Sequence, residues 1–482
     1  MSFKKFLLIT IILLFTTNCS NDSQELSIDY EKYTLDNGLK VILHKDSSDP
    51  LVAISTIVHV GSNREKPGKT GFAHFFEHMA FTASENTPRG ANRLLIPTWG
   101  GSRNGGTSFD YTIYYEVVPK DALEKLMWID SDRLGFMINT VDAETLEGEI
   151  QVVKNEKRQR VDNQPYGHSS GIIQKALYPQ GHPYSWSVIG ELEDLQAATI
   201  EDVKEFYNEF YGPSNATVVI AGDIDFDETK QLVERWFGEI KPNKNVIEKP
   251  KVRLVTLSET KKLYHLDKYA QLPQLSLTFP TVEQFSKDSY ALNTLGELLS
   301  DGRNSVFYKE IIEKQKLAPS ASAYNYSSEI AGQFSMSVRA NPNTSLNDIY
   351  SAIIQSLENF ETNGVSDNDL KRIKAGQETA FYNSISTNLS KARQLGFYNE
   401  YAGDPGFVST DIANILSVTK EDVIRVYNKY IKNQHAVILS VVPKSQPELI
   451  LNDSQEAYVK EEEVVRGKEK QFDMKYGQEN KP

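Results

Sequence analysis

The sequence predicts an α+β protein built from two tandem homologous domains, each an α/β sandwich. Two observations support this prediction. A helix-then-strand segment occurs twice, 220 residues apart, and strand-like and helix-like segments alternate in clusters along the 482 residues. At ~100–200 residues per domain, a chain of this length has room for both copies.

The repeat is carried by residues 199–211 and 419–431, which are identical at six positions of a constant register. Each copy begins with a threonine and an acidic first turn, a pattern typical of a helix N-terminus. Each then continues into a β-branched run, ATVVIAG or AVILSVV, that predicts a buried strand. A spacing of 220 residues is far longer than the ~20–50 residues of solenoid repeats, so it indicates two domains.

The stretch between the two copies predicts the domain boundaries. Residues 239–262 are rich in Pro, Asn and Lys, which is typical of a linker. We therefore place a first domain at residues 28–241, a linker at 242–260 and a second domain at 261–444. Residues 445–482 are strongly charged and predict a solvated C-terminal tail.

Within the first domain, strand signals come first. GLKVILHK follows a turn at Asp36, Asn37 and Gly38 and precedes LVAISTIVHV, so two strands are expected there. Residues 107–118, TSFDYTIYYEVV, predict one further strand, because β-branched and aromatic side chains dominate the run. Helical periodicity then predicts helices at residues 121–137 and 143–161.

The N-terminus has the pattern of an export signal. Two lysines precede an apolar run at residues 6–15, which is shorter than the ~20 residues of a membrane-spanning helix. The single cysteine, Cys19, follows this run, and the segment resembles a bacterial lipoprotein signal. Residues 1–18 would then be a signal peptide, and 19–27 a tether from lipidated Cys19 to the envelope of a Gram-negative bacterium. An ordinary signal peptide with an incidental cysteine is the alternative.

Composition excludes several classes of protein. One cysteine excludes an intrachain disulfide framework and a zinc site built from several cysteines. A formal charge of -13 argues against a general nucleic-acid binder. A mean hydropathy of -0.44 argues against a polytopic membrane protein.

One short segment has the pattern of a catalytic metal site. His74 and His78 are four residues apart, so a helix places both imidazoles on one face at a spacing suited to a metal. Glu77 would project beside that metal, where a carboxylate can take a proton from water. This order, H-x-x-E-H, is the inverted zinc peptidase signature.

Two histidines leave a catalytic zinc one protein ligand short. The helix expected at residues 143–161 offers carboxylates, and Glu149 and Glu156 share a face with two valines. Glu156 as the ligand with Glu149 one layer behind it fits this face, but the spacing alone does not choose between them.

Several segments together resemble the insulinase-type zinc metallopeptidases, and most closely their processing-peptidase-like bacterial members. The resemblance rests on GFAHFFEHMAF at residues 71–81, EIQVVKNE at 149–156 and Pro165-Tyr166-Gly167. It covers nearly the whole mature chain. It implies a clamshell-like pair of domains, each a mostly antiparallel sheet covered by helices. The implied zinc ligands are His74, His78 and Glu156, with Glu77 as general base and Glu149 as supporting acid.

The resemblance also implies the substrate and how it binds. We expect a metalloendopeptidase that uses one Zn²⁺ per chain to cleave oligopeptides or unfolded segments. Substrate would join a sheet edge as an added strand near Asn104, Gly105 and Thr107. The alternative for residues 104–106 is a plain turn.

One departure from the family predicts a partner chain. Family members that complete the active site usually carry an Arg and a Tyr in a stretch that matches residues 310–320. Ile312 and Pro319 occupy those two positions here. We therefore expect a related partner chain that supplies the pair, or a homodimer. A non-catalytic scaffold subunit of such a heterodimer is the competing class of function.

Overall fold

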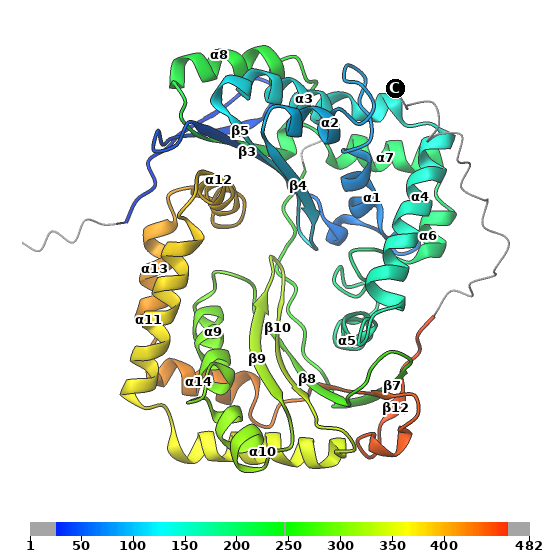
Figure 1. The fold of residues 1–482 in the computed structure, drawn as a ribbon, viewed down its shortest axis with the longest axis vertical. Helices are drawn as coiled ribbons and strands as arrows, with labels where there is room; N and C mark the ends of the chain where they lie inside the picture. The colour runs from blue at the N-terminus through cyan, green and yellow to red at the C-terminus, as the bar shows by residue number, and fades with distance from the viewer. Residues whose placement is uncertain (1–25, 245–246, 461–482) are drawn as a thin grey trace, which may run out of the picture.

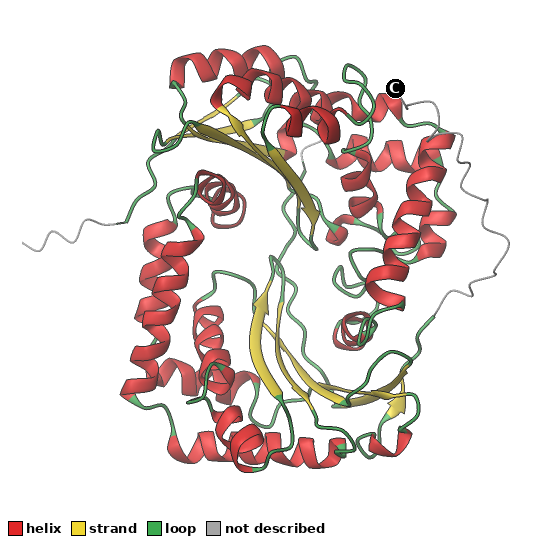
Figure 2. Cartoon of the chain, viewed as in Figure 1, coloured by secondary structure: helices red, strands yellow, loops and turns green. Residues whose placement is uncertain are grey.

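The computed structural model describes residues 26–244 and 247–460 and has one six-stranded sheet in each half of the chain (Figure 1). Helices cover the sheets, as Figure 2 shows. The predicted α+β fold with two tandem domains of one type is thus confirmed. The predicted signal peptide and Cys19 lie outside the described residues. None of the described helices is long and apolar enough to span a membrane.

The first sheet has the strand order β1-β2-β6-β3-β5-β4. Only β2 and β6 run parallel to each other, and β4 is an edge strand. The strands are β1 (Glu31–Thr34), β2 (Lys40–Lys45), β3 (Leu51–Val58), β4 (Ser102–Thr107), β5 (Thr112–Pro119) and β6 (Ala216–Gly222).

Helices of the first half pack on this sheet and around its β4 edge. A core of fully buried side chains, including Ile54, Leu126 and Val203, joins the strands to α3 and α7. The α-helices are α1 (Phe72–Met79), α2 (Ala91–Thr98), α3 (Leu123–Phe136), α4 (Ala143–Lys157), α5 (Ser169–Leu177), α6 (Leu192–Gln196), α7 (Ile200–Phe210) and α8 (Phe226–Phe237).

The second sheet repeats the plan in the order β12-β7-β11-β8-β10-β9. Its strands are β7 (Lys261–Asp267), β8 (Gln274–Thr281), β9 (Ser320–Ser327), β10 (Gly332–Arg339), β11 (Val437–Pro443) and β12 (Gln455–Glu456). The α-helices of this half are α9 (Lys287–Ser300), α10 (Leu346–Asn363), α11 (Asp367–Ser384), α12 (Asn388–Phe397), α13 (Val408–Ser417) and α14 (Lys420–Tyr430).

The sequence repeat coincides with a structural repeat. Thr199 and Thr419 each cap a helix, α7 or α14, and each forms a capping box with the aspartate three residues later. Each helix leads into a fully buried strand, β6 or β11. The predicted caps, helices and strands of both copies are therefore confirmed.

The two halves exchange one helix each. Helix α12 of the second half packs on β3 and β6 of the first sheet, where Leu395 joins a core with Ile42 and Val219. Helix α5 of the first half packs on β8 and β11 of the second sheet, where Ile172 contacts Leu439 and Val441. Each sheet is thus covered on one face by the other half of the chain (Figure 1).

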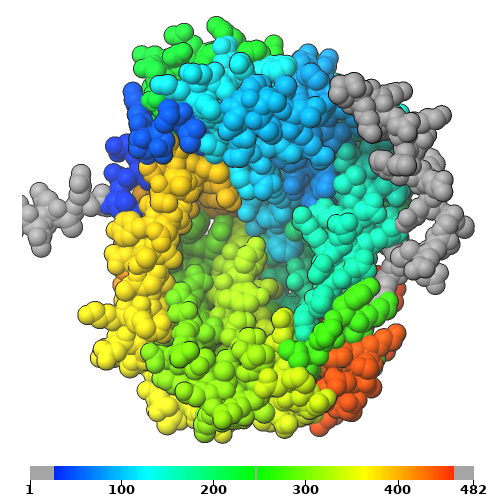
Figure 3. Space-filling view, in the orientation of Figure 1, coloured from blue at the N-terminus to red at the C-terminus, as the bar shows by residue number. Residues whose placement is uncertain are grey.

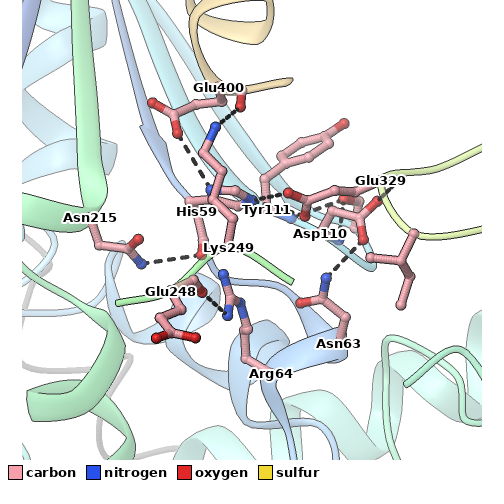
Figure 4. A network of polar contacts seen from close by, with 12 residues as sticks. His59, Asn63, Arg64, Asp110, Tyr111, Asn215, Glu248, Lys249, Glu329 and Glu400 are labelled. Carbon is pink, nitrogen blue, oxygen red and sulfur yellow. Dashed lines mark hydrogen bonds and ion pairs between the residues drawn. The ribbon is translucent and has the colours of Figure 1, made fainter. Parts of the chain in front are cut away.

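A buried polar network joins the halves, drawn in Figure 4. His59, at the end of β3, is 3% exposed. Its Nε2 lies 2.9 Å from the Glu329 carboxylate and its Nδ1 lies 3.4 Å from Glu400 Oε2, so two acids of the second half contact one imidazole of the first. Asp110, in the β4–β5 turn, accepts hydrogen bonds from Tyr184 and from the backbone N–H of Glu329.

Two expectations from the sequence are wrong. Residues 107–118 do not form one strand, because the chain turns at 108–111, where Ser108 Oγ accepts the Asp110 N–H, and separates β4 from β5. The predicted tail is not entirely solvated, because Leu449 and Leu451 are buried in the second core and β12 pairs in parallel with β7. The described part of the predicted linker contains neither helix nor strand.

Candidate metal centre

Helix α1 carries the H-x-x-E-H segment, and a buried carboxylate fixes where the helix begins. Gly71 precedes α1 with φ 89, a conformation that favours glycine. Both oxygens of Glu65 accept backbone N–H groups of this first turn, from Gly71 and Ala73, each at 2.9 Å. Burial raises the pKa of Glu65 to about 8. Glu65 therefore holds the first turn of α1, which includes His74.

Three donor atoms from α1 and α4 converge at one point. His74 Nε2 and His78 Nε2 lie 3.3 Å apart. Glu156 Oε2, from α4, lies 3.0 Å from His78 Nε2 and 3.5 Å from His74 Nε2. Among the described residues, this is the one group of His, Cys, Asp and Glu side chains whose donor atoms lie close enough together to hold a metal ion.

These distances fit a tetrahedral zinc ion. Ligand atoms bound at the ~2.0–2.2 Å typical of zinc stand roughly 3.3–3.6 Å apart around a tetrahedron. The distances from His74 Nε2 to the other two donors, 3.3 and 3.5 Å, lie in this range, and the 3.0 Å between His78 Nε2 and Glu156 Oε2 is slightly shorter. Glu156 Oε2 is also buried, and its near neighbours are the two imidazole nitrogens, as a ligand oxygen of such a site requires.

The protonation states suit a metal site only in part. Burial, together with the neighbouring His78, lowers the pKa of His74 to about 4, so this imidazole is neutral at pH 7. A hydrogen bond with His78 lowers the pKa of Glu156. Burial opposes the charged form of His78, but its hydrogen bond with Glu156 outweighs burial and raises its pKa. A proton and a metal ion would therefore compete for His78.

Glu77 lies next to this cluster and is held by the neighbouring edge strand. The Thr107 hydroxyl, at the end of β4, donates to Glu77 Oε2 at 2.8 Å. Burial raises the pKa of Glu77, while this hydrogen bond opposes the rise. The remaining oxygen of Glu77 has no described hydrogen-bond donor, so it is available to a proton.

Glu149 lies behind the cluster. Its Oε2 is 3.9 Å from His78 Nδ1, and its Oε1 accepts the Thr82 hydroxyl at 2.8 Å. The expected face of α4 is only partly correct, since Val153 is fully buried but Val152 is 44% exposed. Glu149 and Glu156 both point toward α1, but only one of the two valines of the predicted face is buried with them.

Asn104 and Gly105 lie within β4, so the alternative of a plain turn for residues 104–106 is wrong. The outer edge of β4 has no partner strand in the described sheet. A Cβ on Gly105 would come within 2.8 Å of the Phe81 ring, which explains the glycine at this point. Ile312 lies in a π-helical turn of the second half, and Pro319 directly precedes β9.

Sequence reasoning did not identify Thr82 and Arg160 as contacts of this cluster, and it assigned Thr107 to substrate binding without its contact with Glu77. Thr82 and Thr107 hold Glu149 and Glu77, and Arg160 Nη1 lies 2.7 Å from Glu156 Oε1. The spacing of Arg160, four residues after Glu156, was a usable signal, because such residues meet on a helix. The contacts of Thr82 and Thr107 join distant parts of the chain and had no such signal.

Two protein-family models match this chain in succession. The model described as Insulinase (Peptidase family M16) matches residues 40–182. The model described as Peptidase M16 inactive domain matches residues 197–377. The first match contains H-x-x-E-H and the second begins at the first copy of the repeat.

Known proteins resemble the chain over most of its length. Zinc protease PqqE of Helicobacter pylori is 28% identical over 456 residues, which cover 92% of this chain and 99% of the relative. Uncharacterized zinc protease YmxG of Bacillus subtilis is 25% identical over 368 residues, 76% of this chain and 87% of the relative. The crystal structure of a protease from Helicobacter pylori matches with a TM-score of 0.80 and 26% identity, covering 86% of this chain and 100% of that one.

Proposed function

The chain belongs to the insulinase family of peptidases, among its bacterial processing-peptidase-like members, and we propose that it is a zinc-dependent metalloendopeptidase. The observation that carries this proposal is the convergence of His74, His78 and Glu156 within 4.8 Å, with Glu77 beside them. Two imidazoles and one carboxylate form a donor set that suits zinc.

When bound, zinc supplies a Lewis acid that acidifies water and polarises the carbonyl of a peptide bond. Glu77 then takes a proton from the attacking water and gives it to the leaving amine. Its raised pKa suits both transfers, because the group must accept a proton and release it again near neutral pH. Thr107 orients the carboxylate while it does so.

Glu149 supports the site through His78. A carboxylate near the far ring nitrogen of a ligand histidine fixes the ring's orientation and tautomer. Thr82 holds Glu149 in place for this role. Glu149 thus acts on the metal site through a ligand rather than on the substrate.

The edge of β4 is the proposed substrate site. An unpaired strand edge offers its N–H and C=O groups to an extended peptide, which makes binding tolerant of sequence. Asn104, Gly105 and Thr107 lie along this strand, and Thr107 also contacts Glu77. A peptide paired with β4 would therefore pass close to the base.

The remaining assignments belong to the same proposal. Residues 28–241 form the catalytic domain, 261–444 a second domain of the same fold, and 242–260 join them. A related chain carrying the missing Arg and Tyr, or a second copy of this chain, completes the active chamber. The enzyme is exported and held at the cell envelope through Cys19. A purified chain that is fully active as a monomer would contradict the partner assignment.

Replacing the proposed base tests the function. We expect Glu77→Gln to keep zinc and to lose peptide cleavage by at least ~100-fold, as for other general bases. The matched control is Glu147→Gln, because Glu147 is an exposed carboxylate of the same α4. We expect this variant to keep both zinc and peptide cleavage. Zinc content and cleavage of a quenched-peptide mixture are measured on tagged chain purified with any bound partner.

Two outcomes would contradict the proposal. Unchanged cleavage by Glu77→Gln would remove the base assignment. A wild-type preparation that binds zinc and cleaves no peptide would favour the scaffold subunit instead.

A further inference from the structure

The two oxygens of Glu156 have different partners. Oε2 faces the imidazoles of His74 and His78. Oε1 lies 2.7 Å from Arg160 Nη1, which makes the two groups an ion pair. The Glu156 side chain is only 13% exposed, so this contact involves a largely buried carboxylate.

Arg160 lies in a π-helical turn, residues Arg158–Asp162, that continues α4 directly beyond Glu156. Such wide turns are rare and occur mostly as single insertions in helices. An ion pair between Lys157 and Asp162 spans this one at 3.1 Å. The Arg160 side chain is 77% exposed, yet its guanidinium reaches back to the metal cluster. A cation is favourable at any helix C-terminus, but that effect does not require contact with a ligand oxygen.

We propose that Arg160 is a positioning residue that orients Glu156 to offer one oxygen to the metal. A carboxylate free at both oxygens can rotate or present both of them. The guanidinium occupies Oε1 and leaves Oε2 facing the imidazoles. Arginine stays charged at every pH that a protein tolerates, so the cation of this pair is always present.

Two physical effects of Arg160 oppose each other. Its positive charge repels a metal ion, so removing it would tighten metal binding if charge alone mattered. Its ion pair with Oε1 orients the ligand, and losing such an outer partner typically weakens metal affinity by ~10–100-fold. The sign of the change therefore separates the proposed role from a plain surface charge.

Arg160→Met keeps much of the side-chain length and removes charge and donors together. We expect it to bind zinc ~10–100-fold more weakly than wild type, measured by competition with a chromophoric chelator. Arg160→Lys keeps a positive charge but lacks the planar guanidinium, so we expect its zinc affinity to lie between those of wild type and Arg160→Met. Arg235→Met is the matched control, because Arg235 is also exposed and makes a similar 2.8 Å contact with Glu124 on α3, in a pair that includes no metal donor.

A second readout follows the geometry of the site directly. Co²⁺ loaded in place of zinc gives an absorption spectrum that depends on ligand number and geometry. We expect Arg160→Met to change this spectrum and Arg235→Met to leave it as in wild type. Zinc binding by Arg160→Met as tight as wild type or tighter, with an unchanged cobalt spectrum, would overturn the proposal.

The inference rests on the proposed metal site, but the two can fail separately. If the wild-type chain binds no zinc, the proposed function itself fails. If wild type binds zinc and Arg160→Met matches it in both zinc affinity and cobalt spectrum, only the role of Arg160 fails.

Discussion

The two halves have the same topology but differ where two equivalent helices meet. In the first half α1 follows β3 and faces α4, and imidazoles and carboxylates converge there. In the second half α9 follows β8 and faces α11, and there Gln377 Nε2 donates to Glu297 Oε1 at 2.9 Å. An amide and a carboxylate pair with each other in the place where the first half gathers three possible metal ligands.

The second half also has a groove beside its edge strand. Beside β9, a groove of about 500 Å³ lies between α9 and α11, lined by residues that include Tyr324, Gln377 and Phe381. Figure 3 shows a separate hollow at the centre of the visible face, bordered by yellow and green segments of the second half and blue segments of the first. The shared scaffold therefore does not by itself make a candidate metal site. His74, His78 and Glu156 make one on one pair of helices, and the other pair keeps the same positions without them.

The largest effect should come from the helix pair that carries the donors. We expect His78→Ala to lower zinc affinity by more than the ~10–100-fold typical of outer partners, because it removes a proposed ligand. Glu297→Ala, on the matching helix α9, should leave zinc affinity unchanged. Equilibrium dialysis against buffered zinc measures both. An equal loss of zinc affinity in the two variants would contradict the assignment of the metal donors to the first half alone.

Removing the metal should destabilise the first half more than the second. A ligand at ~100 times its Kd stabilises the folded state by about 2.7 kcal/mol, and here that binding would join α1 to α4. We expect a chelator to lower the melting temperature of wild type and to expose α4 to proteolysis before α11. Glu156→Gln should show no chelator response. A chelator response of equal size in Glu156→Gln would contradict this expectation.

The junction between the halves should weaken as pH rises. Burial opposes the charge on His59, but contacts with Glu329 and Glu400 outweigh it and raise the pKa of His59. A raised pKa means that this stabilisation is complete below pH ~6.5 and is lost as pH rises through the folded-state value. Burial raises the pKa of Asp110 to about 6, so its ionisation beside Glu329 acts in the same direction.

Two other titratable groups at the junction do not change their charge in the pH range where His59 loses its proton. The pKa of Glu400 is lowered despite burial, by His59 and then Lys40, so its contribution is lost only in acid. The Tyr401 ring contacts His59 edge-on at 5.5 Å and stays neutral throughout. Above pH ~6.5 we expect the melting temperature of His59→Gln to fall less with rising pH than that of wild type. The difference should be about 2–4 °C for each kcal/mol of unfolding free energy that His59 contributes. A parallel fall in the variant and in wild type would contradict the role of His59.

The smallest effects should be equal in the two halves. Thr199→Ala and Thr419→Ala each remove one capping box, and each should cost about 1 kcal/mol of unfolding free energy. Urea unfolding measures both. A large difference between the two variants would mean that the repeated helices contribute unequally to stability, although their caps are alike.

Local patterns predicted most of the fold and the proposed ligand set. The capping threonines predicted α7 and α14, and the register of His74, Glu77 and His78 predicted one helical face. The choice between Glu149 and Glu156 needed the family resemblance or the structure, because both lie on the same side of α4.

What the sequence did not predict depends on contacts between distant residues. The β4–β5 turn interrupts a run of strand-forming residues, and its Ser108–Asp110 hydrogen bond leaves no strong pattern. Thr107 meets Glu77 only after the sheet edge and α1 have packed together. The burial of Leu449 and Leu451 needs the finished second core, which charge composition cannot show.

The exchange of α5 and α12 bears on how such a chain could arise. A single copy of the repeat would leave bare the apolar sheet face that the other copy's helix now covers. The smallest unit that buries both faces is a pair of copies trading helices, in other words a domain-swapped dimer. Joining two such copies in one polypeptide makes the swap permanent and frees each copy to diverge. One copy could then acquire or lose metal donors without ceasing to complete the core of its neighbour.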